Sequence, residues 1–285
     1  MQFARNTLSW LRHDGRHFQI IAQVSFLLYG ILALGWDADW RNYAVIFSAV
    51  LVAQFIAIRF AGYPIHSLKS ALITGLGLSL LMKANDPWLY LFAAFLAIGM
   101  KFITKVNGKH LWNPANFGIV VVAAISGDAW ISPGQWGSSA LIMFIVGTAG
   151  LAVLSNIKRL ETGIAFLTTY AVLEYARTVI YLGWESDVFL LKLGSGSLWL
   201  FSFFMITDPM TTPNHPKIRI AWAMLVALVS FYLGNFKFLN GAPFWTLFFF
   251  TPITPLLDYL TPRIRSFSWK RSGTKNTLTI QKSSL

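Results

Sequence analysis

The chain has no cysteine and few charged residues. None of its 285 residues is cysteine, which excludes disulfide bonds, thiolate catalysis, iron–sulfur clusters bound by the chain's own thiolates and covalently attached c-type haem. Only 12% of the residues are charged, about half the share in an average soluble domain. The sequence also lacks the metalloprotease His-Glu spacing, a phosphate-binding loop and a Gly-x-Ser-x-Gly elbow, so a hydrolase is not expected.

Histidine is too sparse and too scattered to hold a haem. The five histidines stand in expected loops or at the ends of apolar blocks, where no two of them can face each other across a bundle. They are residues 13, 17, 66, 110 and 215. We therefore expect no haem and no metal site.

Apolar sequence dominates what is present. Apolar residues make up 55% of the chain and aromatic residues 16%. Apolar blocks of about 15 to 20 residues recur along nearly the whole length, which indicates an integral membrane protein with many helices rather than a soluble domain with one anchor. The net charge of +12 comes from short gaps between the blocks and from the tail. We expect it to orient the helices among membrane lipids, and we expect no nucleic-acid partner.

The apolar blocks predict one all-α polytopic membrane domain of about ten transmembrane helices. The predicted spans are Phe18–Gly35, Tyr43–Phe60, Leu68–Met82, Trp88–Ile103, Asn113–Ser126, Ser138–Leu154, Thr162–Leu182, Val188–Ile206, Ile220–Phe236 and Ala242–Leu260. Residues 1–17 then form a cytoplasmic N-terminal segment, 18–127 a first set of five helices, 128–262 a second set, and 263–285 a disordered basic tail.

The basic residues predict the orientation of these spans. With a cytoplasmic N-terminus, 18 of the 23 Lys and Arg residues fall on the cytoplasmic side. By the positive-inside rule, both termini are expected in the cytoplasm, and the membrane is the inner one if the chain is bacterial. No small-residue cleavage site follows the first span, so a cleaved signal peptide is not expected.

Two of the spans are too short or too interrupted to be ordinary. Asn113–Ser126 has 14 residues, and a regular helix of that length reaches only about two thirds of a ~30 Å hydrocarbon core. Val188–Ile206 contains Lys192 and the sequence GSGS in its middle. Broken segments are tolerated at membrane depth only where protein or a water-filled cavity covers the freed backbone groups, so these spans point to a site.

The two halves of the chain resemble each other. Asp86-Pro87 closes the third span and Asp208-Pro209 closes the eighth, while NPANFG opens the fifth span and NGAPFW opens the tenth. Because each half has five spans, the second half must be inserted upside down relative to the first. This predicts two inverted five-helix repeats with a binding site at their interface, although short apolar strings can also agree by coincidence.

The motif NPANFG has a definite local chemistry. Asn113 can cap the helix that follows, Pro114 suits the first helical position, and Gly118 permits close approach of another backbone or a ring. The start of this helix could bind an anion or an electron-rich carbonyl, with Asn116 one turn inside it. The alternative is a capped helix without a ligand.

Three stretches, two of which contain the motifs described above, carry a family resemblance. LWNPANFGIVVV (111–122), FFMITDPMTTP (203–213) and TPLLDYLTPR (254–263) resemble the motifs of a membrane-subunit family. It comprises the NqrB component of the sodium-translocating NADH:quinone oxidoreductase and the RnfD component of the Rnf electron-transport complex. The resemblance implies ten helices in two inverted repeats, similar to urea and ammonium channels. It also implies bound flavin, electron transfer through the membrane and other membrane redox subunits as partners.

The chain departs from this family at the covalent flavin site. The family carries flavin mononucleotide on a threonine between the fifth and sixth spans, within a Ser-Gly-Ala-Thr motif. The corresponding stretch, residues 127–141, has no threonine, and Ser138 and Ser139 are its only hydroxyls near the expected place. The resemblance therefore implies a short form of the family with non-covalent flavin, as FMN or riboflavin.

Polar residues near the span ends are the remaining candidates. Asp208 can cap the next turn or line a cofactor or ion path, and Thr207, Thr211 and Thr212 add hydroxyls beside it. Asp258 is expected to pair with Arg263 or to face the same cytoplasmic opening as Asp208.

One ionisable pair is predicted inside a span. Glu174 lies deep in the seventh span, and Arg177 follows three residues later, on the same helical face. This pair is either structural or part of an ion path.

Two functions remain. The sequence favours a membrane electron-transfer protein, a component of a membrane oxidoreductase, that holds non-covalent flavin with Asn113, Pro114, Asn116, Gly118, Thr207, Asp208, Thr211 and Thr212 and couples electron flow to ion transport. The alternative is a channel or transporter for a small solute, such as flavin itself, on the same fold without redox activity.

Overall fold

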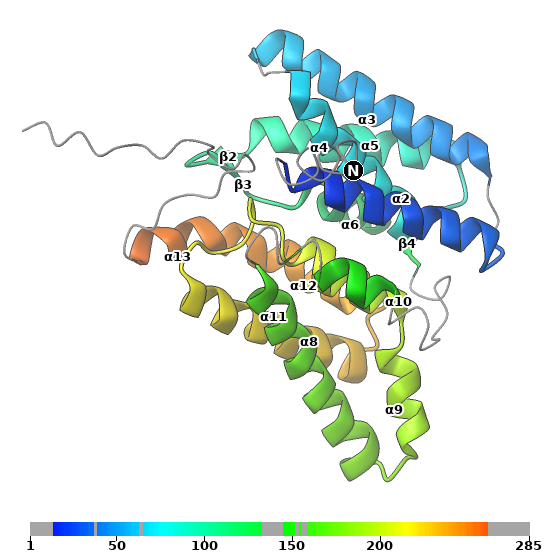
Figure 1. Ribbon diagram of the computed structural model, residues 1–285, viewed down its shortest axis with the longest axis vertical. Coiled ribbons are helices and arrows are strands. Elements are labelled where there is room, and N and C mark those ends of the chain that lie inside the picture. The colour runs from blue at the N-terminus through cyan, green and yellow to red at the C-terminus, as the bar shows by residue number, and fades with distance from the viewer. Residues whose placement is uncertain are drawn as a thin grey trace, which may run out of the picture.

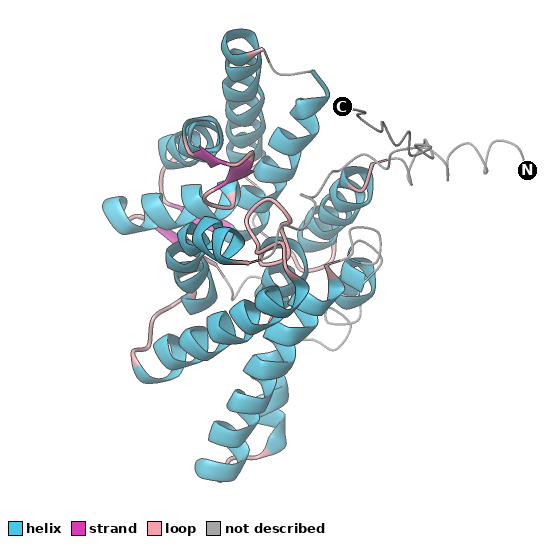
Figure 2. Cartoon of the chain, turned by 90° about the vertical axis from the view of Figure 1, so that its left-hand side faces the viewer, coloured by secondary structure: helices cyan, strands magenta, loops and turns pink. Residues whose placement is uncertain are grey.

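The computed structural model describes residues 14–36, 39–62, 65–132, 145–151, 154 and 159–261. Helices make up most of this structure (Figures 1 and 2). The α-helices are α2 (Arg16–Leu32), α3 (Trp40–Ala61), α4 (Leu68–Leu81), α5 (Pro87–Ile103), α6 (Pro114–Ser126), α8 (Leu160–Tyr175), α9 (Ser186–Leu193), α10 (Gly196–Leu200), α11 (Pro216–Phe236), α12 (Ala242–Phe250) and α13 (Thr254–Leu260). Residues 145–151 are also helical.

Shorter elements extend or connect these helices. Two π-helical segments, η3 (Ala176–Tyr181) and η4 (Phe201–Met205), continue α8 and α10, and two 3-10 turns are η1 (Ile65–Ser67) and η5 (Thr251–Ile253). The strands described are β1 (Met82–Ala84), β2 (Lys105–Val106), β3 (Lys109–His110) and β4 (Ala129–Ile131). They pair antiparallel as β1 with β4 and as the hairpin β2–β3.

The predicted spans coincide with these helices. Nine of the ten fall in described helical segments, with ends that differ by a few residues, and Ser138–Leu154 lies largely outside the described residues. Within the described part, α3 and α11 are each long and apolar enough to cross a membrane, and α4, α5 and α6 are shorter apolar helices. The bent pair of α9 with α10–η4 makes a third crossing if it counts as one span.

The interruption predicted in the eighth span is confirmed. Helix α9 ends at Leu193 and α10 begins at Gly196, with the two parts bent by 51°. The segment continues as the π-helical η4 and leaves helical geometry at Ile206. The chain therefore carries non-helical backbone immediately after a buried apolar segment, and other parts of the protein must satisfy its polar groups.

The first half has its own interrupted segment. Helix α4 ends at Leu81 and passes directly into β1, which pairs with β4 in the register Met82 to Ile131. This short ladder satisfies the backbone that α4 releases. The start of α12 packs against the ladder: a Cβ at Gly241 would lie only 2.5 Å from Ile131 Cδ1. Gly241 also has a φ of +67°, which favours glycine.

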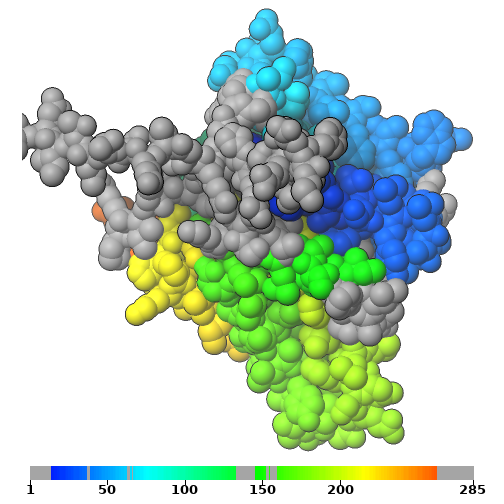
Figure 3. Space-filling view, viewed as in Figure 1, coloured from blue at the N-terminus to red at the C-terminus, as the bar shows by residue number. Residues whose placement is uncertain are grey.

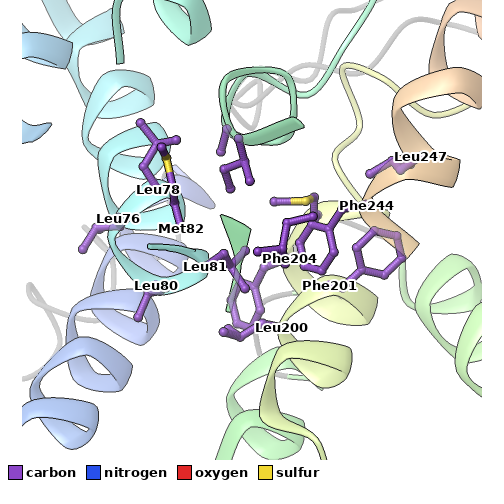
Figure 4. Packing of buried hydrophobic residues seen from close by; sticks show 14 of the residues in the cluster. Leu76, Leu78, Leu80, Leu81, Met82, Leu200, Phe201, Phe204, Phe244 and Leu247 are labelled. Carbon is purple, nitrogen blue, oxygen red and sulfur yellow. The ribbon is translucent and has the colours of Figure 1, made fainter. Parts of the chain in front are cut away.

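The two halves meet through apolar side chains. Figure 3 shows residues of the first half, in blue and cyan, and residues of the second half, in green and yellow, at opposite ends of the molecule. Between them, Leu80 and Leu81 of α4 and Leu200 and Phe204 of the α10–η4 segment belong to one buried apolar cluster, part of which is drawn in Figure 4. Phe204 also packs edge-on against Phe26 of α2, with ring centroids 5.6 Å apart. The broken segment of the second half is thus held against the first half.

Gly118 brings α5 and α6 together. A Cβ at Gly118 would lie 2.5 Å from the backbone oxygen of Ala93, so α6 approaches the α5 backbone itself. This confirms the close approach predicted from the sequence. It also holds α6 against α5 close to the start of α6, where Asn113 lies.

Replacing Gly118 with alanine is expected to destabilise the protein. The added methyl meets backbone that can move only by separating the two helices, a strain of about 1 to 3 kcal/mol. The thermal unfolding midpoint of Gly118→Ala in detergent should fall by several degrees. Gly99→Ala is the matched control, because a Cβ at Gly99 in α5 meets nothing within 4 Å, and it should leave the midpoint unchanged or raised. Equal midpoints in the two variants would contradict the close packing.

Candidate functional site

One hydrogen bond joins the broken segment of the second half to the first half. The Asn113 side-chain amide donates to Asp208 Oδ2 at 3.0 Å, while Asn113 Oδ1 accepts from the backbone N–H of Asn116 at 3.1 Å. Asn113 therefore caps α6 and holds Asp208 at the same time. Pro114 is the first residue of α6. The capping role predicted for this motif is confirmed.

Asn116 and Gly118 lie deeper in α6 and are covered by protein. Asn116 is fully buried, and its amide donates to the backbone oxygen of Phe244 in α12 at 3.1 Å. Gly118 faces Ala93 of α5. The structure thus gives both residues a packing role, in which α6 is fixed between helices of the two halves.

Asp208 organises the loop that follows η4. Its Oδ1 accepts the backbone N–H of Met210 at 2.9 Å, and its backbone oxygen accepts the hydroxyls of Thr211 and Thr212 at 3.4 and 3.0 Å. Thr207 turns its hydroxyl back to the Phe203 carbonyl at 2.7 Å. Asp208 therefore caps its own turn, as predicted, and also bonds across to the first half.

Asp258 completes the connection by pairing with Lys109. The predicted partner Arg263 lies outside the described residues. Lys109 of β3 donates to Asp258 Oδ2 at 2.8 Å and also to the Thr212 backbone oxygen. Asp258 accepts from the backbone and side chain of Asn214 at 2.7 and 2.9 Å. The loop between η4 and α11 is thus clamped by groups from both halves.

A cavity of about 290 Å³ lies at this junction. Its first-half wall comes from α2, α3, η1, α4, α5, the β2–β3 hairpin and the start of α6. Its second-half wall is the segment from Leu200 to Met210. Asn113, Pro114, Thr207 and Asp208 line the cavity. The other residues predicted to bind a cofactor, Asn116, Gly118, Thr211 and Thr212, are not among its lining residues.

The cavity also has polar lining residues that sequence reasoning missed as site residues. Gln23 of α2, Gln54 of α3 and Lys101 of α5 are each at most 6% exposed. The sequence does carry a signal for this site, because each of the three is a polar residue inside an apolar helix. For Lys101 the signal is ambiguous, since a lysine at the cytoplasmic end of a span is also expected from the positive-inside rule. Arg16 at the start of α2 joins them.

Burial shifts the pKa values of groups near the cavity. Burial raises the pKa of Asp208, whereas the Met210 N–H, the Asn113 amide and the positive charges of Lys109 and Arg159 act in the opposite direction.

The neighbouring histidine is held in its neutral form. Burial lowers the pKa of His110 to about 3, and the charges of Lys101 and Lys105 act in the same direction, against a hydrogen bond with the Lys101 backbone. His110 is therefore uncharged near neutral pH, and the cavity's positive charge comes from Lys and Arg side chains.

The predicted pairing of Glu174 with Arg177 is wrong. Glu174 pairs with Lys192 of α9 and accepts from Thr178 at 3.2 Å and from Asn235 at 2.8 Å. Arg177 instead lies over the Phe236 ring, 5.3 Å from its centroid. The helix changes to π geometry at Ala176, so residues three apart no longer share a face.

These features define an α-helical membrane protein with a cavity at the junction of two broken segments. The model of the NQR2, RnfD, RnfE family matches residues 124–266, which is half of the chain. The chain belongs to this family.

Curated relatives agree with the family assignment. The D-type subunit of the ion-translocating oxidoreductase complex from Aeromonas salmonicida (strain A449) is 22% identical over 333 residues, covering 87% of this chain and 94% of its own length. The protein of the same name from Halorhodospira halophila (strain DSM 244 / SL1) is 22% identical and covers 86% and 89%. The one from Cronobacter sakazakii (strain ATCC BAA-894) is 32% identical over a shorter region, 56% of this chain and 45% of its own.

Removing the Lys109 charge is expected to destabilise the protein strongly. Lys109→Met leaves the largely buried Asp258 carboxylate without its counter-charge, a loss of about 3 to 5 kcal/mol for a buried pair. The control is Lys217→Met, at an exposed lysine in the first turn of α11, which should change the unfolding midpoint little. A midpoint of Lys109→Met equal to that of the control would contradict the clamp.

Proposed function

We propose that this chain is the D-type membrane subunit of an ion-translocating oxidoreductase complex and carries a non-covalent flavin in the cavity at the Asn113–Asp208 junction. The observation that carries the proposal is the cavity itself. It is lined by two of the family-like motifs, and one of them is the broken membrane segment. Other membrane redox subunits are the partners we propose, and the electrons passed between them are coupled to ion movement.

The packing supports the proposal of ten spans in two inverted repeats. In the first half, α3 packs on α5 and α5 on α6, while in the second half α8 packs on α11 and α11 on α12. The described part of each half also contains an interrupted segment, α4–β1 in the first half and α9–α10–η4 in the second. We propose that these segments are equivalent and that the cavity lies at the interface of the repeats.

The orientation follows from the charges. With both termini in the cytoplasm, the positive-inside rule places the β2–β3 hairpin, Asp208 and Asp258 on the cytoplasmic side. The exposed apolar residues of α3 and α5, such as Phe55, Leu91 and Phe95, would then face lipid. A flavin at the junction would be reached by an electron donor from that side.

The lining residues fit a flavin. An isoalloxazine ring is flat, with apolar faces and a polar edge, and the cavity combines apolar and aromatic walls with convergent polar groups. Phe203, Phe204 and Leu81 supply apolar surface, and Asn113 and Asp208 supply polar atoms. Gln23 Oε1 is a buried polar atom without a partner in the described structure, which also indicates a polar ligand.

The flavin would supply reversible uptake and release of one or two electrons. The chain's own residues orient and insulate it. Asn113 is fixed by the cap of α6, so its amide presents a constant donor to Asp208. Asp208, with its pKa raised by burial, can take up a proton at Oδ2 when negative charge enters the cavity. The surrounding apolar side chains exclude water and make such charge compensation necessary.

The test is whether the purified protein carries flavin and loses it when the cavity is filled. After gentle detergent extraction, the wild-type protein should absorb at about 450 nm, and denaturation should release the chromophore, as general flavin chemistry requires. Thr74→Trp places a large side chain in the cavity lining and should reduce the flavin content at least about tenfold.

Thr168→Trp is the matched control. Thr168 is exposed on α8. Like the Thr74 hydroxyl, its hydroxyl donates to the backbone oxygen of the residue four positions earlier. The control should keep its flavin. A colourless wild-type protein would favour solute transport on the same fold, and equal flavin in both variants would place the flavin elsewhere.

A further inference from the structure

Lys101 is a buried lysine in the cavity wall without a carboxylate beside it. It lies in the last turn of α5, is 6% exposed and lines the cavity. Its ammonium donates to Gln54 Oε1 at 2.7 Å, and the Gln54 amide donates to Ser67 Oγ at 3.1 Å. Among the described residues, no Asp or Glu lies within ion-pair distance of Lys101. An ammonium buried with only a neutral amide partner is costly, and an anion beside it would favour the charged form of Lys101.

Four other buried or partly buried cations of the described chain have carboxylate partners. Arg16 pairs with Asp14, Lys109 with Asp258, Lys192 with Glu174 and Arg219 with Glu161. Lys101 is different because its open side is the cavity. Among the described residues that line the cavity, Asp208 is the only carboxylate, and it already binds Asn113 and the Met210 N–H.

A second, independent feature points the same way. Gln23 on α2 is 5% exposed, lines the cavity and has a side-chain oxygen without a partner in the described structure. Its amide can turn to present either the oxygen or the N–H₂ group. Arg16 and Lys105 also line the cavity. The first-half wall therefore contains basic side chains together with a buried amide whose oxygen has no partner in the described structure.

We propose that Lys101 and Gln23, with Arg16 nearby, form an anion subsite that binds a phosphate or carboxylate of the cavity ligand. The apolar body of that ligand lies against Phe203 and Phe204. Only the identification of this apolar body as a flavin ring rests on the proposed function. The anion could belong to a soluble phosphate ester or to the head group of an anionic phospholipid, since both offer the same charged oxygens.

The experiment compares FMN with riboflavin, which have the same ring system and differ by one phosphate. Each is titrated into flavin-depleted protein in nanodiscs of neutral lipid, with quenching of flavin fluorescence as the readout. Wild type should bind FMN at least about tenfold more tightly, as expected for a charge-assisted hydrogen bond. Lys101→Met should reduce this preference to about twofold or less, and Lys101→Arg should keep it.

A competition on the wild type avoids dependence on how the variants fold. Inorganic phosphate should displace FMN at lower concentration than it displaces riboflavin. If phosphatidylglycerol in the nanodisc abolishes the FMN preference seen in neutral lipid, the subsite exists and a lipid head group occupies it. Equal affinities for FMN and riboflavin in neutral nanodiscs would overturn the anion subsite and leave the proposed flavin function standing.

If neither flavin binds, the proposed function fails and the subsite is tested with lipid alone. Native mass spectrometry then compares phosphatidylglycerol with neutral diacylglycerol retained by wild type and by Lys101→Met. Selective retention of phosphatidylglycerol by wild type, lost in the variant, supports the subsite. Equal retention overturns it.

Discussion

The hydrogen bond from Asn113 to Asp208 is the interaction on which the rest of the site depends. It joins the start of a short helix in the first half to the end of a broken segment in the second half. Backbone that leaves helical geometry in a membrane protein must be satisfied by protein or enclosed water. Asn113 meets this requirement by capping α6 with one end of its amide and holding Asp208 with the other. The cavity lies where these two segments fail to fill the space between them.

The neighbouring ionic contacts reinforce this junction. Lys109 and Asp258 fix the loop after η4 from both sides, while Lys101 stays in the cavity wall with Gln54 as its partner. One set of charges is therefore used to hold the fold, and another is directed at the cavity. This separation is physically reasonable for a ligand site, because fully paired charges rigidify the structure whereas an incompletely paired one favours a bound anion.

Much of this was predictable from the sequence, and the rest was not for definite reasons. Apolar length predicted the helices, and the GSGS sequence predicted the break near Gly194, because these are local properties. The cap at Asn113 followed from its place before Pro114. Lys101 and Gln54 were missed because their facing depends on how α5 and α3 are rotated against each other. The Glu174–Arg177 pair was predicted wrongly because spacing assumes an α-helix, and the chain there is a π-helix.

A side-chain exchange tests the Asn113–Asp208 junction most directly. Asn113→Asp places two carboxylates together, and Asp208→Asn places two amide donors together, so each should lower the unfolding midpoint. In the double variant, Asn at 208 can donate to Asp at 113, which still caps α6 and leaves every polar atom paired. We expect its midpoint to return to within a few degrees of the wild type, about 1 kcal/mol. A double variant as unstable as the sum of the two single variants would contradict the account.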